Sequence, residues 1–212
     1  MSELLDISRW PRRAAFEHFR HLAHPFFSLC AEVEVGALAA RLQRQRGATL
    51  FLAYHHAALR AANAVVPFRY RLAGEGVRVH ERVDGSTTVL REDQSIGFAP
   101  LDYVPDFADF VARAQPALAA ARRPAPDLGA EAAPGGQALI HMTTIPWLAF
   151  TSFSHARAAG DSVPKLAFGR ITARADGRRV MPVAVEVHHA LMDGLHVGQF
   201  YAALQAALDE AV

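Results

Sequence analysis

The chain has 212 residues, of which 51% are hydrophobic, and its 22 basic and 21 acidic residues leave a formal net charge of +1. This length suits one domain, which we expect to span residues 1–212. The near balance of charge argues against nucleic acid and anionic membranes as partners, because both need a concentrated basic patch. The single Cys30 cannot form a disulfide within the chain, the first residues lack the apolar core of a signal peptide, and no apolar run approaches 18 residues. We therefore expect a soluble, cytoplasmic protein.

Two helices are expected in the N-terminal half, over residues 35–45 and 49–64, because Leu and Ala recur there at helical spacing. From Phe68 onward the hydrophobic period changes to two. Short alternating runs there suggest a meander of strands, with turns at residues 74–76 and at the Asp-Gly pair of residues 84–85.

The second half returns to a helical pattern over residues 105–121, followed by a loop rich in Pro, Gly and Ala over 122–137. Another Asp-Gly pair, at 176–177, predicts a hairpin before a final strand. In that strand Val183, Val185 and Val187 alternate, which is typical of a half-buried strand. The chain beyond Gly194 again has helical spacing. The pattern as a whole predicts an α/β (α+β) fold whose sheet is partly covered by helices.

Two adjacent histidines, His188 and His189, stand where the final strand ends. A neutral imidazole can remove the proton of a hydroxyl as that oxygen attacks a carbonyl, so His189 is a candidate general base. The alternative is that one of the pair simply packs in the interior. Asp193 could likewise serve only as the N-cap of a helix that begins near Leu195. No metal is expected, because neither an H-E-x-x-H helix nor a cysteine pair is present.

Three segments carry a resemblance to a known family. H-H-A-L-M-D-G-L-H-V-G-Q-F, at residues 188–200, resembles the H-H-x-x-x-D-G-x-H motif of type A chloramphenicol acetyltransferases. A bare H-x-x-x-D also occurs in condensation domains and dihydrolipoyl acyltransferases. However, R-W-P-R-R-A-A-F-E-H-F at 9–19 is similar to the family's W-x-R-R-x-x-F segment, and I-P-W-L-A-F-T-S-F at 145–153 to its P-W-x-x-F-T-S-F block. The resemblance covers essentially the whole chain.

The resemblance implies a compact α/β acyltransferase with a mixed sheet, which uses acetyl-CoA and assembles as a homotrimer with each active site between neighbouring subunits. His189 would be the general base toward the acceptor hydroxyl. Asp193 would form an ion pair with Arg12 and hold the motif loop. Thr143 stands where the family has a serine and would donate its hydroxyl to the oxyanion.

The resemblance also assigns residues to the two substrates. Trp147 matches a family contact with coenzyme A, and Arg170 stands at a family lysine that meets the same molecule. Around the acceptor the sequence departs from the family. Phe19 replaces a tyrosine that bonds to chloramphenicol, Ala167 replaces a threonine that holds a water, and His155 occupies an apolar position beside the aryl ring.

These departures leave three functions open. The first is acetyl-CoA-dependent O-acetylation of chloramphenicol or a similar small molecule, with a role in antibiotic resistance. The second keeps acyl transfer but changes the hydroxylated acceptor, because altered polar groups in a pocket strongly change discrimination. The third is a non-catalytic trimer that binds hydrophobic small molecules.

Overall fold

The computed structural model describes residues 2–42, 48–125, 138–158 and 160–210. The strands are β1 (Ser2–Leu4), β2 (Phe26–Glu34), β3 (Tyr70–Ala73), β4 (Gly76–His80), β5 (Asp84–Leu90), β6 (Ile96–Leu101), β7 (Leu139–Thr144), β8 (Lys165–Phe168), β9 (Thr172–Ala173) and β10 (Arg179–His188). The helices are α1 (Arg13–Phe19), α2 (Gly36–Leu42), α3 (Leu50–Ala64), α4 (Phe107–Ala121) and α5 (Gly194–Glu210), with short 3-10 turns η1 (Ile7–Arg9) and η2 (Val66–Arg69).

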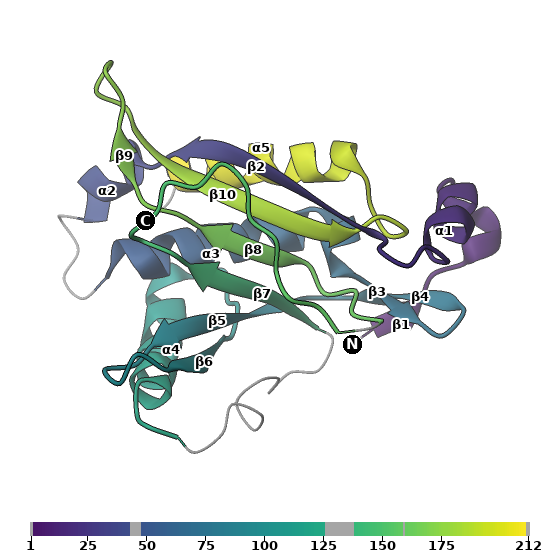
Figure 1. Ribbon diagram of the computed structural model, residues 1–212, viewed down its shortest axis with the longest axis horizontal. Coiled ribbons are helices and arrows are strands. Elements are labelled where there is room, and N and C mark those ends of the chain that lie inside the picture. Colours follow the sequence, from purple (N-terminus) through teal and green to yellow (C-terminus); the bar gives the residue numbers. More distant parts are fainter. Residues whose placement is uncertain (1, 43–47, 126–137, 159, 211–212) are drawn as a thin grey trace.

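A seven-stranded mixed sheet forms the centre of the molecule (Figure 1). Its strands follow the order β2-β10-β8-β7-β5-β6, and β9 pairs with one end of β10. β7 runs parallel to both of its neighbours, whereas the other pairs are antiparallel. The predicted α/β fold with a mixed sheet covered by helices is therefore confirmed.

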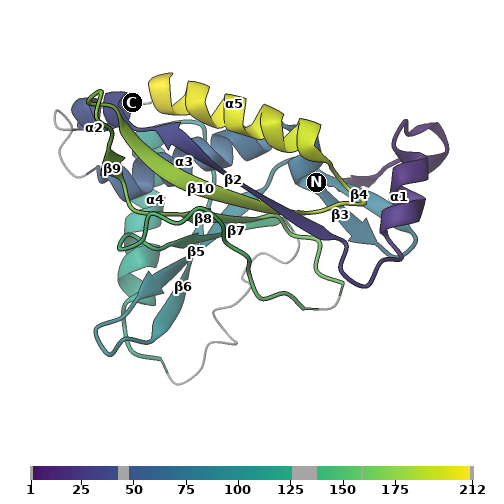
Figure 2. The same ribbon diagram turned by 45° about the horizontal axis from the view of Figure 1, so that its top comes forward.

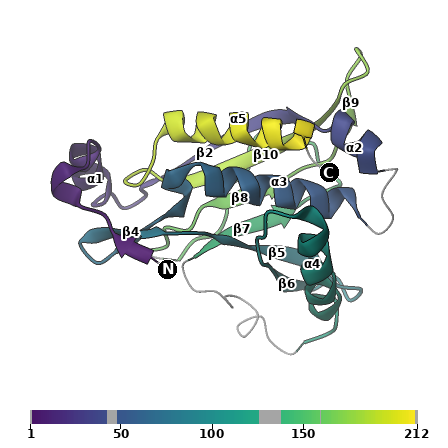
Figure 3. The same cartoon turned by 180° about the vertical axis from the view of Figure 1, so that it is seen from behind.

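Helices α3 and α5 lie side by side across one face of this sheet, as the views in Figures 2 and 3 show. α3 begins after Thr49, whose side chain accepts the amide hydrogen of Leu52, and α4 begins after the corresponding cap Asp106. These helices match the predicted patterns. The predicted helix over 35–45 corresponds to α2, but its last residues and most of the 122–137 loop lie outside the described residues. No helix within the described ranges is long and apolar enough to cross a membrane.

The predicted meander is wrong in one respect. The turn at residues 74–76 connects β3 to β4, and Gly74 adopts a positive φ of 57° there. However, β4 pairs with both β1 and β3 in a separate sheet, and Asp84 and Gly85 begin β5 instead of forming a hairpin turn. A Cβ on Gly85 would lie 2.5 Å from the Met142 methyl carbon and 3.2 Å from Leu101, so a side chain here would have to displace the end of Met142 and press on the core.

The final strand, β10, is buried on both faces, so the expectation of a half-buried strand is also wrong. α5 covers the side that carries the valines. The described chain between β7 and β8, residues 145–158 and 160–164, crosses the other side (Figure 1). Several bonds hold this crossing segment. Among them, the Ser28 hydroxyl donates to the Phe153 carbonyl, and Glu186 accepts the amide hydrogen of His155. The hairpin predicted at 176–177 is confirmed, with Gly177 at a φ of 84°.

Candidate active site

His189 follows the last residue of β10 and stands at the start of the turn into α5. Its amide donates to the Pro25 carbonyl at 2.7 Å, which fixes the backbone. Its ring stacks on Phe19 of α1, with centroids 3.8 Å apart and planes 12° apart, and it contacts Phe27 at 4.8 Å. Strand, turn and two aromatic rings therefore hold one imidazole in one orientation.

The hydrogen bond of the His189 ring determines its tautomer. Nδ1 lies 3.2 Å from the carbonyl oxygen of Met192. Because a carbonyl can only accept, Nδ1 carries the proton in the neutral ring and Nε2 keeps a lone pair. This arrangement can accept a proton from a hydroxyl placed against Nε2.

Arg12, from the segment before α1, holds the turn that carries His189. Its guanidinium donates to three groups: Asp193 Oδ2 at 3.1 Å, the Ala190 carbonyl at 3.0 Å and the His189 carbonyl at 3.1 Å. The ion pair predicted between Arg12 and Asp193 is thus formed. It is only partly buried, because the Asp193 side chain remains 39% exposed.

Asp193 also faces His196, whose Nδ1 lies 3.0 Å from the carboxylate. Desolvation works to raise the pKa of Asp193, but His196 and Arg12 outweigh it and hold that pKa below its usual value. The Asp193 carbonyl accepts the amide hydrogens of His196 and Val197 at the start of α5. The helix-capping position and the ion pair therefore coexist at this residue.

The neighbouring His188 has a different environment. It is 3% exposed, its ring meets Phe26 edge-on, and its Nδ1 accepts the amide hydrogen of Ala190. Burial, helped by the positive charge of Arg157, lowers its pKa to about 4. The structure thus separates the histidine pair into a buried member and a member with a free ring nitrogen.

Thr143 lies elsewhere on the sheet, on β7. Its hydroxyl is 2.7 Å from the hydroxyl of Thr88 on β5. Both threonines line a cavity of about 330 Å³ together with His155. His155 was predicted beside the acceptor, and it does share this cavity with Thr143.

One chain does not bring His189 and Thr143 together. Thr143 is in register with Ala167 on β8, which is in register with Ala184 on β10. His189 follows the end of β10, two strands away from β7 and five residues beyond Ala184. At about 4.8 Å between strands and 3.3 Å per residue, the two side chains are roughly 15–20 Å apart. Within one subunit they are too distant to act on the same hydroxyl.

Ala167 occupies the position between Thr143 and Ala184 and is fully buried. Phe19 is not in the cavity that contains Thr143, because it packs on His189. The seven residues predicted around chemistry and acceptor therefore form two groups. Arg12, Asp193 and Phe19 lie beside His189, whereas Ala167 and His155 lie beside Thr143.

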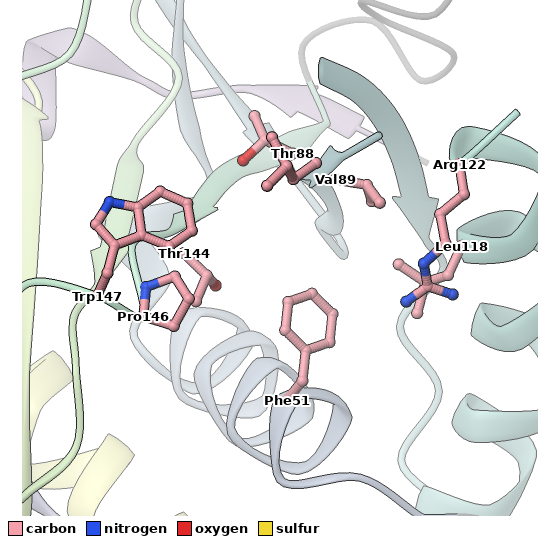
Figure 4. Close-up of a pocket in the computed structure, with 9 residues that line it drawn as sticks. Phe51, Thr88, Val89, Leu118, Arg122, Thr144, Pro146 and Trp147 are labelled. Carbon is pink, nitrogen blue, oxygen red and sulfur yellow. The ribbon is translucent and has the colours of Figure 1, made fainter. Parts of the chain in front are cut away.

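A second cavity, of about 210 Å³, opens beside the start of the crossing segment (Figure 4). Trp147, which is 56% exposed, lines it on the side opposite Leu118 and Arg122, and Phe51 lies between them. Thr88 lines both cavities, so they meet at this strand. Arg170 does not line the cavity, but its amide donates to the Leu148 carbonyl beside Trp147.

Sequence reasoning missed several polar residues at the cavity that contains Thr143. These are Ser86, Thr88, His141 and Lys165, which line it, and the ion pair of Arg157 with Glu186 that anchors the crossing segment. The alternation of side chains within β5, β7 and β8 could have predicted that the cavity residues share one face of the sheet. That they lie next to one another across the strands follows only from the register between the strands.

Comparison with known proteins gives consistent results. A family model for chloramphenicol acetyltransferase matches residues 2–205. A chloramphenicol acetyltransferase of Streptomyces acrimycini is 34% identical over 96% of this chain and 93% of its own length. One from a Klebsiella species is 28% identical over 97% and 93%.

Solved structures agree. A chloramphenicol acetyltransferase superposes with a TM-score of 0.89 at 32% identity, over 98% of this chain and 100% of that one. The cubic core of a pyruvate dehydrogenase multienzyme complex, at 18% identity and a TM-score of 0.72 over 93% and 86%, shares the fold. The predicted family and its acyltransferase class are confirmed, and the chain belongs to the chloramphenicol acetyltransferase family.

Proposed function

We propose that the protein is a single-domain O-acetyltransferase that forms a homotrimer and moves the acetyl group of acetyl-CoA to a hydroxyl of chloramphenicol or a similar small molecule. The observation that carries the proposal is the state of His189. Its Nδ1–H donates to the Met192 carbonyl, which leaves Nε2 as a base, and Phe19 holds the ring against rotation. The aromatic setting and fixed tautomer suit general-base catalysis.

In this proposal His189 takes the acceptor's hydroxyl proton while the hydroxyl oxygen bonds to the thioester carbonyl carbon. The carbon–sulfur bond then breaks, and the proton passes from His189 to the departing thiolate, which leaves as a thiol. Negative charge develops on the carbonyl oxygen, and the Thr143 hydroxyl donates to it. The neighbouring Thr88 hydroxyl, 2.7 Å away, orients that donor.

The separation of His189 from Thr143 supports an active site shared between subunits. A donor and a base that act on one reacting centre must each lie within about 3 Å of it. Because the same chain holds them roughly 15–20 Å apart, we infer that the base of one subunit meets the Thr143 of its neighbour. A cyclic trimer gives three equivalent sites of this kind.

The cavity beside Trp147 suits acetyl-CoA. Its walls include Phe51, Leu118 and Trp147, which fit an apolar arm, and Arg122 at the edge can pair with a phosphate. Thr88 links this cavity to the one that contains Thr143, so a thioester could reach the Thr143 hydroxyl from this side. Arg170 is exposed nearby and could supply a second cation.

The test is thiol release from acetyl-CoA in the presence of chloramphenicol. His189→Ala should lower kcat by about 10²- to 10⁴-fold while the oligomer stays intact. His21→Ala, at an exposed histidine outside the site, is the matched control and should retain wild-type turnover. A folded His189→Ala variant with more than about a tenth of the activity would remove His189 from the mechanism. An inactive wild type that still binds chloramphenicol would instead favour the non-catalytic binding protein.

A further inference from the structure

The cavity that contains Thr143 has mainly apolar walls and one lysine. Phe98, Met142 and Ala156 supply apolar surface, and Lys165 of β8 lines the same cavity. Lys165 is the only lysine of the chain, since the other 21 of its 22 basic residues are arginines. An ammonium is a compact point charge with three hydrogens, whereas a guanidinium is a planar fork. This wall therefore presents a donor of a kind that the rest of the chain lacks.

The register between strands places Lys165 close to the Thr143 hydroxyl. Thr143 on β7 is in register with Ala167 on β8, and Lys165 stands two residues earlier on β8. Because alternate residues of a strand point to the same face, Lys165 and Thr143 project from the same side of the sheet. At about 4.8 Å between strands and 3.3 Å per residue, their Cα atoms are about 8 Å apart. One small aryl molecule can therefore lie between the two side chains.

The Lys165 ammonium has one hydrogen to spare. Its Nζ lies 3.0 Å from the Asp161 carboxylate and donates to the Ala156 carbonyl at 3.0 Å. No third partner of this ammonium occurs within residues 2–42, 48–125, 138–158 and 160–210, so two of its three hydrogens are used. The side chain keeps 13% of its surface exposed, so a ligand in the cavity can reach it.

The charges around Lys165 cancel. Asp161 pairs with both Lys165 and Arg157, and Glu186 pairs with Arg157. Two cations and two carboxylates leave this cluster neutral, so an anionic ligand would gain little net attraction and would be repelled by Asp161. A neutral group with an acceptor oxygen gains a charge-assisted hydrogen bond without that repulsion. The cavity thus suits an apolar ring that ends in a neutral oxygen acceptor.

We propose that Lys165 is a specificity-determining residue for the acceptor. The aryl ring of a chloramphenicol-type molecule lies against the apolar walls, and the spare Lys165 hydrogen bonds to a neutral, oxygen-bearing substituent of that ring, such as a nitro group. This inference rests on the proposed acetyltransferase function and names the part of the acceptor that the cavity recognises. Lys165 takes no part in proton transfer, which stays with His189.

Two acceptors and two enzymes form the test. Chloramphenicol carries a nitro group on its ring, and the matched analogue carries hydrogen in its place. For the wild type we expect kcat/KM to be about ten-fold or more higher with the nitro compound, the effect of one hydrogen bond from a charged donor. Lys165→Met keeps the length of the side chain but removes the ammonium, and it should lower this ratio by about five-fold or more. Arg113→Met, a similar change at an exposed cation of α4, should leave the ratio unchanged.

The single lysine gives a second measurement that needs no variant. Reductive methylation of Lys165, followed by mass spectrometry, should be slower when the wild-type protein is saturated with chloramphenicol, because the bound acceptor covers the ammonium. A lysine-containing peptide in the same reaction is the control, and its methylation rate should not change.

Failure of this inference differs from failure of the function. An unchanged ratio in Lys165→Met, or a wild type that does not discriminate between the two acceptors, overturns the role of Lys165 and leaves the acetyltransferase function standing. If neither acceptor causes thiol release, the function fails. The methylation rate then decides about Lys165, as it also does if the variant does not fold: slower methylation with chloramphenicol supports the inference, and an unchanged rate contradicts it.

Discussion

Arg12 and Asp193 are 181 positions apart in the chain, yet the guanidinium Nε of one lies 3.1 Å from the carboxylate of the other. The same guanidinium also bonds the carbonyls of His189 and Ala190. One side chain near the N-terminus therefore fixes both ends of the turn that carries the candidate base. We expect the pair to act on the geometry of the turn and to leave the proton transfer to His189.

The first prediction concerns this pair. Arg12→Ala should lower kcat more than Asp193→Ala, because the arginine also loses its two bonds to carbonyls. The double variant should lose far less than the product of the single effects, since both changes release the same turn. Arg12→Lys keeps the positive charge but cannot make the three hydrogen bonds of the guanidinium, so it should recover little of the lost kcat.

The measurement is kcat for the four proteins of the cycle under identical conditions. Fully multiplicative single effects would mean that the two residues act independently. Solvent screens the half-exposed carboxylate, so the stability coupling should fall below the roughly 3–5 kcal/mol cost of breaking a fully buried pair.

The second prediction concerns the Thr143 hydroxyl. Thr143→Val replaces the hydroxyl with a methyl group at nearly constant volume, and it should lower kcat about 10²- to 10³-fold with little change in the KM for acetyl-CoA. Thr143→Ser keeps the donor and should retain most of the activity. Equal losses in the two variants would show that packing, and not the hydroxyl, matters at this position.

The third prediction concerns stability at acid pH. His55 in α3 is fully buried, with its ring nitrogens 2.8 Å from the Phe51 carbonyl and 3.0 Å from the Thr87 hydroxyl. Burial lowers its pKa to about 4 from the usual 6.5. Between these values the unfolded chain binds a proton that the folded chain does not, so stability should fall as pH drops from about 6.5 to 4, by about 3 kcal/mol in total.

Denaturant unfolding at fixed protein concentration across this pH range measures the effect. His55→Gln cannot titrate, and its stability should depend on pH less steeply, by up to about 1.4 kcal/mol per pH unit. The same pH slope in both proteins would contradict the assignment of a depressed His55 pKa.

Local patterns predicted the parts of the fold that depend on neighbours in sequence. The periods of α3, α4 and α5 and the turn at Gly177 were readable because capping, helical spacing and a positive φ are local properties. The hairpin turn predicted at the Asp-Gly pair of residues 84–85 is wrong because that prediction also used local sequence alone. Its glycine packs closely against Met142 and Leu101, which are distant in sequence.

The candidate site likewise has a part that local sequence predicts and a part that depends on residues distant in sequence. His189 and Asp193 stand in one contiguous motif, and Arg12 was found through the family resemblance. Three separate strands carry Ser86, His141 and Lys165 side by side. No local pattern in the sequence predicts the register between these strands. Burial of β10 was underestimated because the segment that covers its second face carries no periodic pattern.

The central claim is that His189 of one subunit serves Thr143 of another. The most direct test mixes His189→Ala and Thr143→Val subunits, each nearly inactive alone, under conditions that reassort the oligomer. If each site joins two subunits, then random mixing at equal amounts gives about a quarter of the sites an intact histidine and an intact threonine, and about a quarter of wild-type activity should return. If both residues of a site came from one chain, the mixture would stay as inactive as its components, and that result would contradict the account.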